Sequence, residues 1–327
     1  MQKLKNPVEI KHPTKAVLAF AAIYVIWGST YLAIRYAVET IPPLLMMGTR
    51  SLTAGAVLFA VSRARGHEGP KREHYLSLLI IGTSFFLVGH GLLAWAEQKV
   101  PSGLAALLVG SEPCLIGIIE WIFIRDHKLS FRGIGGLILG FIGIALLVSP
   151  SKELGTSQTD VLGAFAIILG TLSWSGGAVY SRVARLPKSP MVSAGLELMI
   201  GGVLLLVAGF VTGETGALHA VSMHSVLALL YLIVFGSIIA FSAYVWLLTH
   251  TSATRISTHT YINPVFALVL GWALAGESMT LGTILATCII VVSIYLVLSD
   301  RAHTEVSGAS FEVPDSLDED TVRNSMN

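Results

Sequence analysis

A carboxylic acid beside a proline stands in the middle of an apolar stretch, Ser102 to Ile124, which reads SGLAALLVGSEPCLIGIIEWIFI. About 20 apolar residues span the hydrocarbon core of a bilayer, and an acid at that depth costs roughly 2.5 kcal/mol or more without a partner or water. Pro113 has no N–H to donate to the Val109 carbonyl, so a second polar group is freed beside Glu112. Because such a break needs protein or a water-filled cavity around it, Glu112 is predicted either to bind substrate or a proton, or to bond the freed backbone or an arginine.

The same combination of a polar residue and a proline returns later in the chain. Asn263-Pro264 lies 151 residues after Glu112-Pro113, within the apolar run RISTHTYINPVFALVLGWALA. Pro113 and Pro264 are therefore both predicted to break a membrane helix. His259 is four residues before Asn263, so the two share a helix face and either face an internal cavity or pack against a neighbouring helix. Two broken segments indicate an internal pathway across the membrane.

Aromatic residues precede the first of these segments. Trp27, Tyr31 and Arg35 fall at i, i+4 and i+8, and so follow one face of the first apolar segment. Trp27 is at mid-span, away from the interfacial aromatic belt, and Trp174 occupies the matching place later in the chain. We expect these aromatic residues either to line a cavity or to pack between helices. Arg35 and Arg182 are at helix ends and are predicted to anchor the chain by extending to the lipid headgroups.

Four other ionisable residues fall inside apolar segments. Glu120 follows Glu112 by eight residues, where it either joins that site or reaches the membrane interface. Arg50 and Glu197 occupy matching positions in two segments and lie toward opposite membrane faces, so they are not expected to pair. Each is either a gate element or a partly snorkelled structural charge. His90 is predicted to be a hydrogen-bonded core group, with a proton relay as the alternative.

Composition places the chain in the membrane. Hydrophobic residues make up 54% of 327 positions and charged residues 13%, where a soluble domain has about 25% charge. The net charge of +1 excludes a large basic surface for nucleic acid. The helical segments contain no H-E-x-x-H motif and no aspartate, and the chain has no nucleotide-binding G-x-x-x-x-G-K-[ST] loop. Neither a metal nor a cofactor is therefore expected.

The chain is predicted to be an all-α membrane protein with ten transmembrane helices. A polar lead, residues 1–15, precedes them, and a tail, residues 300–327, carries seven acids and is predicted to be disordered. Three glycines in the fifth segment are expected to let another helix of the same chain approach closely: Gly136, Gly140 and Gly143. The ten segments are 16–36, 44–62, 75–96, 102–124, 133–149, 161–181, 191–212, 225–248, 255–275 and 281–299.

The distribution of basic residues predicts the orientation. With the amino terminus inside, 17 Lys and Arg residues fall in cytoplasmic segments, whereas only Lys99 and Lys152 fall outside. This bias predicts that the lead and the tail are both cytoplasmic.

The two halves of the chain repeat. Trp27 and Arg35 recur 147 residues later, and Pro113 and Trp121 recur 151 residues later. Residues 16–149 and 161–299 are therefore predicted to be two copies of one five-helix unit. An odd number of helices inverts the second copy, and inverted repeats around a central cavity are typical of secondary transporters.

Four motifs follow one another along the chain: Trp27-Gly28-Ser29-Thr30, Pro42-Pro43 with Arg50, Pro101-Ser102-Gly103 leading to Glu112-Pro113, and Asn263-Pro264. In this order they resemble the EamA family of the drug/metabolite transporter superfamily, and most closely its YedA-type bacterial members. The resemblance implies a ten-helix inverted-repeat transporter whose cavity is lined mainly by helices 1, 3, 4, 6, 8 and 9. Many members export amino acids or other small metabolites. Asn263 stands where the first copy has Glu112, so a role that needs the acid does not carry over to the second copy.

The expected function is export of a small metabolite, an amino acid or an amphipathic compound, by alternating access in the bacterial inner membrane. The partners are a small-molecule substrate, the lipid bilayer and, if Glu112 titrates, protons. A membrane receptor or another non-transport membrane protein is the alternative, and an intramembrane enzyme is the least favoured class because its catalytic motifs are missing. Paired broken helices with midplane polar groups favour a pathway over a signalling bundle.

Overall fold

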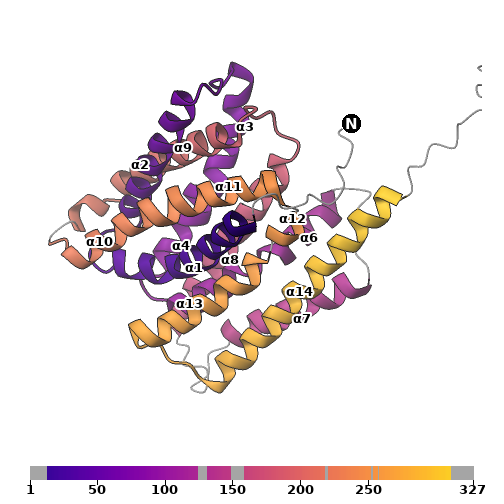
Figure 1. Cartoon of the computed structure of the whole chain (residues 1–327). Helices are drawn as coiled ribbons and strands as arrows, with labels where there is room; N and C mark the ends of the chain where they lie inside the picture. Colours follow the sequence, from indigo (N-terminus) through magenta and orange to yellow (C-terminus); the bar gives the residue numbers. More distant parts are fainter. Residues whose placement is uncertain are drawn as a thin grey trace, which may run out of the picture.

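The fold is entirely helical in the part of the chain that the structure describes. The computed structural model describes residues 13–123, 131–148, 158–217, 220–251, 253–256 and 258–310. Each of the ten predicted apolar segments is helical there. Eight helices are long and apolar enough to cross a membrane, and two apolar helices are shorter, Phe131–Leu146 and His259–Ala275. The chain is thus an all-helical membrane protein, as its composition predicts (Figure 1).

The helices are numbered in chain order. The first half contains α1 (Pro13–Ala37), α2 (Pro43–Ala64), η1 (Arg72–His74), α3 (Tyr75–Gly82), η2 (Thr83–His90), α4 (Gly91–Ala96), α5 (Ser102–Val109), α6 (Glu112–Phe123) and α7 (Phe131–Val148). The second half contains α8 (Gln158–Ser181), α9 (Pro190–Val211), η3 (Glu214–Ala217), α10 (Met223–Tyr231), η4 (Leu232–Ile239), α11 (Ala240–His250), α12 (Ala253–Ile256), α13 (His259–Ala275) and α14 (Leu281–Ser310).

Local sequence explains several helix ends. α2 and α9 both begin at a proline, which has no N–H to leave unbonded at a first helical position. α13 ends at Gly276, whose φ of 64° is the left-handed conformation that glycine adopts most readily. α14 continues to Ser310, so the predicted polar tail begins as helix, and the rest of that tail lies outside the described residues.

The third and eighth predicted segments each contain a π-helical stretch. η2 lies between α3 and α4, and η4 lies between α10 and α11, with starts 149 residues apart. A π-helical turn is wider than an α-helical turn, and it is found frequently at functional sites. The two halves therefore share an uncommon backbone feature at corresponding places.

The predicted break at Glu112-Pro113 is confirmed. α5 ends at Val109 and α6 begins at Glu112, so Gly110 and Ser111 separate two shorter helices. The Ser111 hydroxyl donates to the Leu108 carbonyl at 2.6 Å, and the Ser111 carbonyl accepts from the Cys114 N–H at 2.9 Å. Side chain and backbone thus satisfy polar groups that the interruption leaves.

The predicted break at Pro264 is wrong, because α13 runs through Pro264 without interruption. A proline removes one N–H from the helix and can be accommodated where neighbouring polar groups bond the backbone. With its side-chain amide turned so that the nitrogen faces acceptors, Asn263 donates to the carbonyls of His259 and Tyr24, both at 3.2 Å, and so ties this turn of α13 to α1. α13 itself begins at His259, five residues before Pro264.

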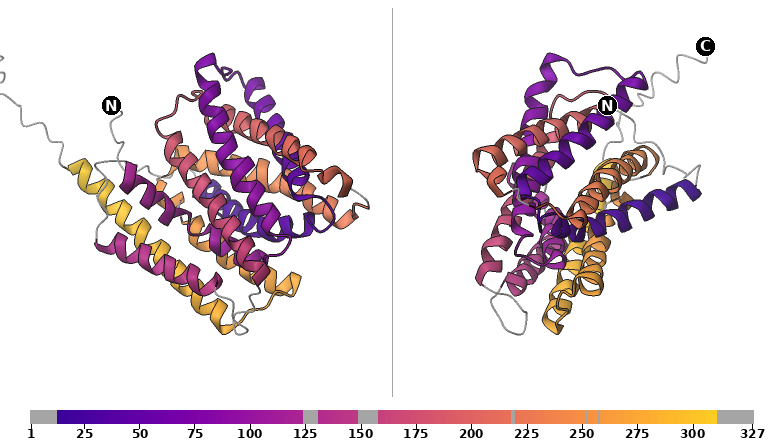
Figure 2. Two further views of the ribbon diagram at one scale, coloured as in Figure 1. Left: turned by 180° about the vertical axis from the view of Figure 1, so that it is seen from behind. Right: turned by 90° about the vertical axis from the view of Figure 1, so that its left-hand side faces the viewer.

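Glycines bring two helix pairs into backbone contact. α2 packs along α9, and α7 packs along α14, as both views show (Figures 1 and 2). A Cβ atom added to Gly202 would lie 2.5 Å from the Leu52 nitrogen, and one added to Gly55 would lie 2.7 Å from the Gly195 carbonyl oxygen. Only residues without a side chain permit this approach.

The pair α7–α14 uses the three glycines that the sequence singles out. Gly136 and Gly140 face Ser293, whose hydroxyl donates to the Gly136 carbonyl at 2.7 Å, and Gly143 faces Ile290. The expectation of close packing within the chain is confirmed.

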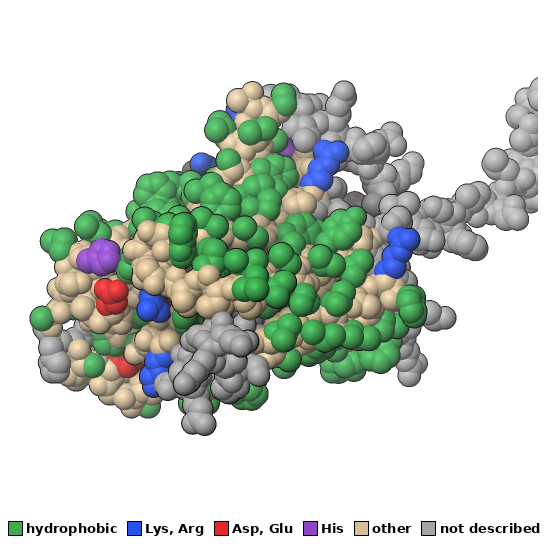
Figure 3. All heavy atoms as spheres, turned by 90° about the horizontal axis from the view of Figure 1, so that it is seen from below, with side chains coloured by type: hydrophobic (Ala, Val, Ile, Leu, Met, Phe, Trp, Pro, Cys, Tyr) green, Lys and Arg blue, Asp and Glu red, His purple; other side chains and the backbone are tan. Residues whose placement is uncertain are grey.

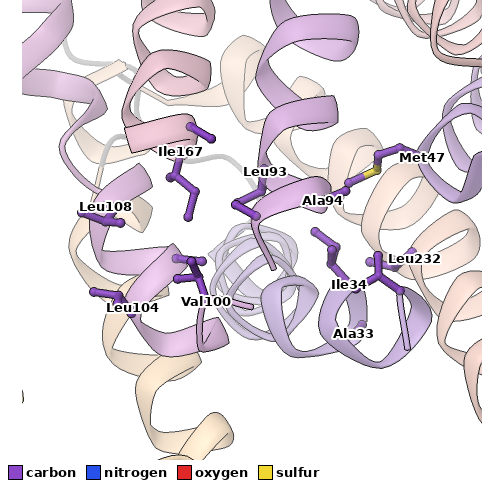
Figure 4. Packing of buried hydrophobic residues seen from close by; sticks show 14 of the residues in the cluster. Ala33, Ile34, Met47, Leu93, Ala94, Val100, Leu104, Leu108, Ile167 and Leu232 are labelled. Atoms are coloured by element: carbon purple, nitrogen blue, oxygen red, sulfur yellow. The ribbon is translucent and has the colours of Figure 1, made fainter. Parts of the chain in front are cut away.

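Apolar side chains fill the interior and also cover the outside. The main core cluster joins α1, α2, α4, α5, α8 and η4, as the close-up of Ile34, Leu93, Leu104 and Ile167 shows (Figure 4). Hydrophobic side chains also cover much of the face in Figure 3. A soluble protein of this size would place polar groups there, so this surface suits contact with lipid.

Replacing Gly202 by alanine tests the α2–α9 contact. The new Cβ atom would meet backbone, which cannot move aside alone, so we expect Gly202→Ala to lower the midpoint of thermal unfolding of the purified protein by several degrees. Gly176→Ala in α8 is the matched control, because nothing lies within 4 Å of its added Cβ and alanine favours a helix by about 1 kcal/mol. Equal midpoints for Gly202→Ala and the wild type would contradict the described packing.

Candidate functional site

Glu112 lies at the interruption between α5 and α6. It is the first residue of α6, where its carboxylate is favoured by the positive end of the helix dipole, and it is half-buried. The interruption also contacts the second proline-bearing segment, since a Cβ atom on Gly110 would lie 3.1 Å from Cγ of Pro264. The structure therefore brings together the two motifs that the sequence places 151 residues apart.

Trp27 forms the centre of one aromatic cluster. Its ring centroid is 5.3 Å from that of Tyr244 and 5.2 Å from that of His259. Its indole N–H donates to the Gly236 carbonyl in η4 at 3.1 Å. The His259 Nδ1 atom is 2.8 Å from the Ile256 carbonyl, and Asn263 is buried on the same helix. Three of the predicted site residues, Trp27, His259 and Asn263, thus lie in one region.

Trp174 forms the centre of a second aromatic cluster. Its ring stacks on Phe85 at a centroid distance of 4.2 Å and lies 5.0 Å from His90. Phe86 contacts His90 edge-on at 5.2 Å. The His90 Nδ1 atom is buried without a hydrogen-bond partner, so the prediction of a hydrogen-bonded core histidine is wrong for this nitrogen. Tyr31 packs against the main core cluster.

Arg50 is buried, with 7% of its surface exposed, and is not snorkelled. Its Nε donates to the Ser237 hydroxyl of η4 at 2.9 Å. Glu197 is also buried, at 8% exposure, on α9. No hydrogen bond or ion pair between them occurs in the described residues, in agreement with the prediction that Arg50 and Glu197 do not pair.

The prediction that Arg182 anchors to lipid headgroups is wrong. Its guanidinium forms an ion pair with the Glu120 carboxylate, whose side chain is 2% exposed. Glu120 accordingly does not extend to the interface. A buried carboxylate without a counter-ion is costly because it loses its hydration. Glu120 and Arg182 therefore orient toward each other instead of toward the lipid headgroups.

Arg35 also pairs with an acid instead of extending to lipid. Its Nε is 3.7 Å from Oε1 of Glu277, a residue that sequence reasoning missed. The Glu277 carboxylate accepts from the Ser102 N–H at 2.7 Å, the Ser102 hydroxyl at 2.8 Å and the Gly103 N–H at 3.0 Å. It therefore caps α5, whose first N–H groups have no partner within the helix. We call this set, Arg35, Glu277, Ser102 and Gly103, the Glu277 cluster.

The two arginine pairs occupy corresponding places. Arg182 follows Arg35 by 147 residues, and Gly271 follows Glu120 by 151. A Cβ atom on Gly271 would overlap the Glu277 carboxylate. Each arginine therefore pairs with a carboxylate at a corresponding place in the fold. The carboxylate belongs to Glu120 in the first half, but in the second half it belongs to Glu277, which is not the residue equivalent to Glu120. Sequence alignment alone hides this correspondence.

Glu97 is a second acid that sequence reasoning missed. It follows α4 directly, just beyond the apolar span Arg72–Ala96, and is 1% exposed. Both carboxyl oxygens are buried without a hydrogen-bond partner. Burial raises the pKa of the Glu97 carboxyl well above its usual range, the Glu277 carboxylate raises it further, and Arg35 lowers it. The sequence does place Glu97 four residues after Leu93, so that it continues one apolar helix face, and this spacing was the available signal.

The described residues hold no group of three or more His, Cys, Asp and Glu side chains that could bind a metal ion. A groove of about 270 Å³ lies between α1 and α10, with the Ser29 and Tyr231 hydroxyls 2.6 Å apart at its edge. This groove is apolar and open, and none of the interior acids borders it.

Comparison with known proteins identifies the family. A model of the EamA-like transporter family matches residues 14–149 and again residues 161–299. The chain belongs to the EamA-like transporter family. It is therefore a multi-pass membrane transporter and not an enzyme. The resemblance drawn from its motifs is confirmed.

Two relatives and one solved structure are similar to this chain over most of its length. The uncharacterized inner membrane transporter YedA of Escherichia coli strain K12 is 39% identical over 282 residues, which cover 85% of this chain and 89% of that protein. The uncharacterized transporter YvbV of Bacillus subtilis strain 168 is 27% identical over 284 residues, which cover 87% and 92%. A solved crystal structure aligns with a TM-score of 0.60 and 21% identity over 88% of this chain and 97% of its own, so the two share a fold.

Neutralising Glu277 tests the capping of α5. Gln keeps one carbonyl oxygen but loses the charge that strengthens the bonds from Ser102 and Gly103, so we expect Glu277→Gln to destabilise the protein by about 1–3 kcal/mol. The measurement is the thermal unfolding midpoint of the purified protein. Glu39→Gln, which neutralises a half-exposed acid, is the control and should have little effect. Equal midpoints for the two variants would show that Glu277 does not stabilise the start of α5.

Proposed function

We propose that the protein is a secondary exporter of a small metabolite, an amino acid or another amphipathic compound, and that it works by alternating access. The observation that carries the proposal is the contact of two proline-bearing segments inside the bundle, where Gly110 approaches Pro264 and Glu112 begins α6. Irregular backbone at membrane depth is tolerated where it is buried in protein or lines a cavity. Transporters use interrupted helices of this kind to hold a substrate near the midplane.

Two inverted five-helix repeats, residues 16–149 and 161–299, are the moving parts in this proposal. Reciprocal glycine contacts support the inversion, because Gly48 meets Gly202 and Gly55 meets Gly195. Gly195 follows Gly48 by 147 residues, and Gly202 follows Gly55 by the same number. Exchanging the halves therefore maps this set of contacts onto itself, as a twofold axis does. Rocking of one repeat against the other would expose a central cavity to each side in turn.

The residues around the interruption suit an amphipathic substrate. Trp27 and Trp174 occupy equivalent places in the two halves, each with a histidine ring within about 5 Å. Aromatic faces attract apolar groups and cations alike. Glu112 supplies a negative charge for an amine, or a site for a coupling proton. An amino acid or an amphipathic amine combines both features.

Two ion pairs are the proposed gates. Arg35–Glu277 joins α1 to the turn after α13, and Arg182–Glu120 joins the end of α8 to α6. Ser102 lies at one end of its apolar segment and Glu120 lies near the other, so the pairs hold opposite ends of the bundle. Alternating access requires that the two ends open in turn, and a pair at each end provides a contact that can break.

Glu112→Gln tests the proposed site. The amide has nearly the same volume and can still hydrogen-bond, so the variant should fold, but it cannot carry the charge. In proteoliposomes screened with amino acids and amphipathic amines, with and without a pH gradient, we expect transport to fall about tenfold or more and to lose its pH dependence. Glu68→Gln, in the exposed loop before α3, is the control. A wild-type rate and pH profile in Glu112→Gln would return this acid to a structural role.

The excess of basic residues in one set of loops supports an orientation with both termini on the cytoplasmic side of a bacterial inner membrane. Single cysteines at Glu68 and at Lys99, in a background without Cys114 and Cys288, test this orientation in intact cells. An impermeant thiol reagent added outside should label Lys99→Cys and spare Glu68→Cys. Labelling in the opposite sense would reverse the topology.

A further inference from the structure

The Glu97 carboxyl is buried at the end of the bundle that the Glu277 cluster closes. Ala96 and Val100, its neighbours in the chain, are 1% and 0% exposed, and Glu97 itself is 1% exposed. Its two oxygens have no hydrogen-bond partner. Burying an ionised carboxylate without a partner is very costly, whereas a protonated carboxyl costs far less. The described arrangement therefore suits Glu97 in its protonated form.

Charged and titratable groups face Glu97 from two helices and one turn. α1 contributes Tyr31 and Arg35, α2 contributes Arg50, and the turn after α13 contributes Glu277. Arg50 already donates to Ser237, on the side of η4. Of the two cations, Arg35 is the one that also pairs with Glu277.

Arg35 is held loosely between the two acids. Its Nε is 3.7 Å from Glu277, beyond hydrogen-bond distance, and its terminal nitrogen donates to the Val100 carbonyl at 3.4 Å. Val100 is one turn after Glu97, so the guanidinium already borders the Glu97 turn. Glu277 meanwhile has three other donors from Ser102 and Gly103, and it remains bonded if Arg35 leaves.

We propose that Glu97 is a second proton-binding site, and that release of its proton transfers Arg35 from Glu277 to Glu97 and opens this end of the bundle. The inference rests on the proposed transport function and names its coupling ion as the proton. The O–H bond of Glu97 breaks, the proton passes to water at this end, and the carboxylate left behind takes Arg35 as its counter-ion. Uptake of a proton reverses these steps and restores the pairing of Arg35, on α1, with Glu277.

The proposed switch opens this end of the bundle as the pH rises and closes it as the pH falls. Protonated Glu97 leaves Arg35 with Glu277, which holds α1 to the turn after α13 and closes this end. Ionised Glu97 removes Arg35 from that contact, so the end opens as the pH rises through the pKa of Glu97. Because burial raises that pKa, opening is expected at a higher pH than an exposed glutamate would give.

Thiol labelling measures the opening without any substrate. Leu104→Cys, in protein that lacks Cys114 and Cys288, places a thiol in α5 where the wild-type leucine is 8% exposed beside Val100 (Figure 4). Gln98→Cys, at the same end and exposed, corrects for ionisation of the thiol itself. The labelling rate of Leu104→Cys relative to Gln98→Cys should rise about tenfold between about pH 6 and about pH 9.

Glu97→Gln mimics the protonated state and should keep the relative rate low at every pH. Glu39→Gln removes a half-exposed acid near the same end and should leave the rise intact. Arg35→Gln provides a second test if Glu97→Gln fails to fold, because without the guanidinium the end should label rapidly at all pH values. A rise in Glu97→Gln equal to that of its parent, or a pH-dependent rise in Arg35→Gln, would overturn the proposal.

The outcome separates this inference from the proposed function. If transport occurs but the relative labelling rate does not change with pH, the proton site at Glu97 is wrong and the exporter stands. If no substrate is moved in the proteoliposome screen, the proposed exporter fails whatever the labelling shows.

Discussion

Within a bilayer, a backbone N–H or C=O has no water to bond, and this constraint shapes the whole fold. Helices satisfy it internally, so every regular element in the described residues is helical. The departures from regular α-helix are therefore informative. The interruption at Gly110 and Ser111 and the π-helical stretches η2 and η4 lie inside the bundle, next to the aromatic clusters around Trp27 and Trp174. Irregular backbone is found where the protein itself supplies the partners.

The bundle contains two kinds of helix contact, one between backbones at glycines and one between aromatic rings. The α2–α9 pair meets backbone to backbone through Gly55, Gly195 and Gly202, with no side chain that could rotate. Such interfaces are well suited to carry motion as rigid bodies. The aromatic clusters are different, because rings at centroid distances of 4.2–5.3 Å can tilt and slide without losing contact. A rigid frame around an adaptable interior is what alternating access requires.

Glutamate appears in four different settings within the bundle. Glu112 starts a helix at the interruption, Glu120 pairs with Arg182, and Glu277 caps α5. Glu97 is buried without a hydrogen-bond partner for either oxygen. The same carboxyl group thus ranges from a fixed structural anion to a group whose charge depends on its protonation, because only the local partners differ.

The sequence alone determined the membrane class, the ten helical segments, the break at Glu112 and the family. These features depend on local hydropathy, on the missing N–H of proline and on the order of motifs, all of which can be read along the chain. The two glycine-rich interfaces could be foreseen in part, since Gly136, Gly140 and Gly143 follow one helix face.

The tertiary structure alone decided which charges meet. Arg35 and Arg182 were predicted to extend to lipid, because a long side chain at a helix end can always do so. Each instead meets an acid from a distant part of the chain, and Glu277 fills the space beside Gly271 that Glu120 fills in the first half. Glu97 resembles a loop residue in sequence, yet helix packing buries it. Partner and burial depend on contacts between residues far apart in the chain, and no local pattern records them.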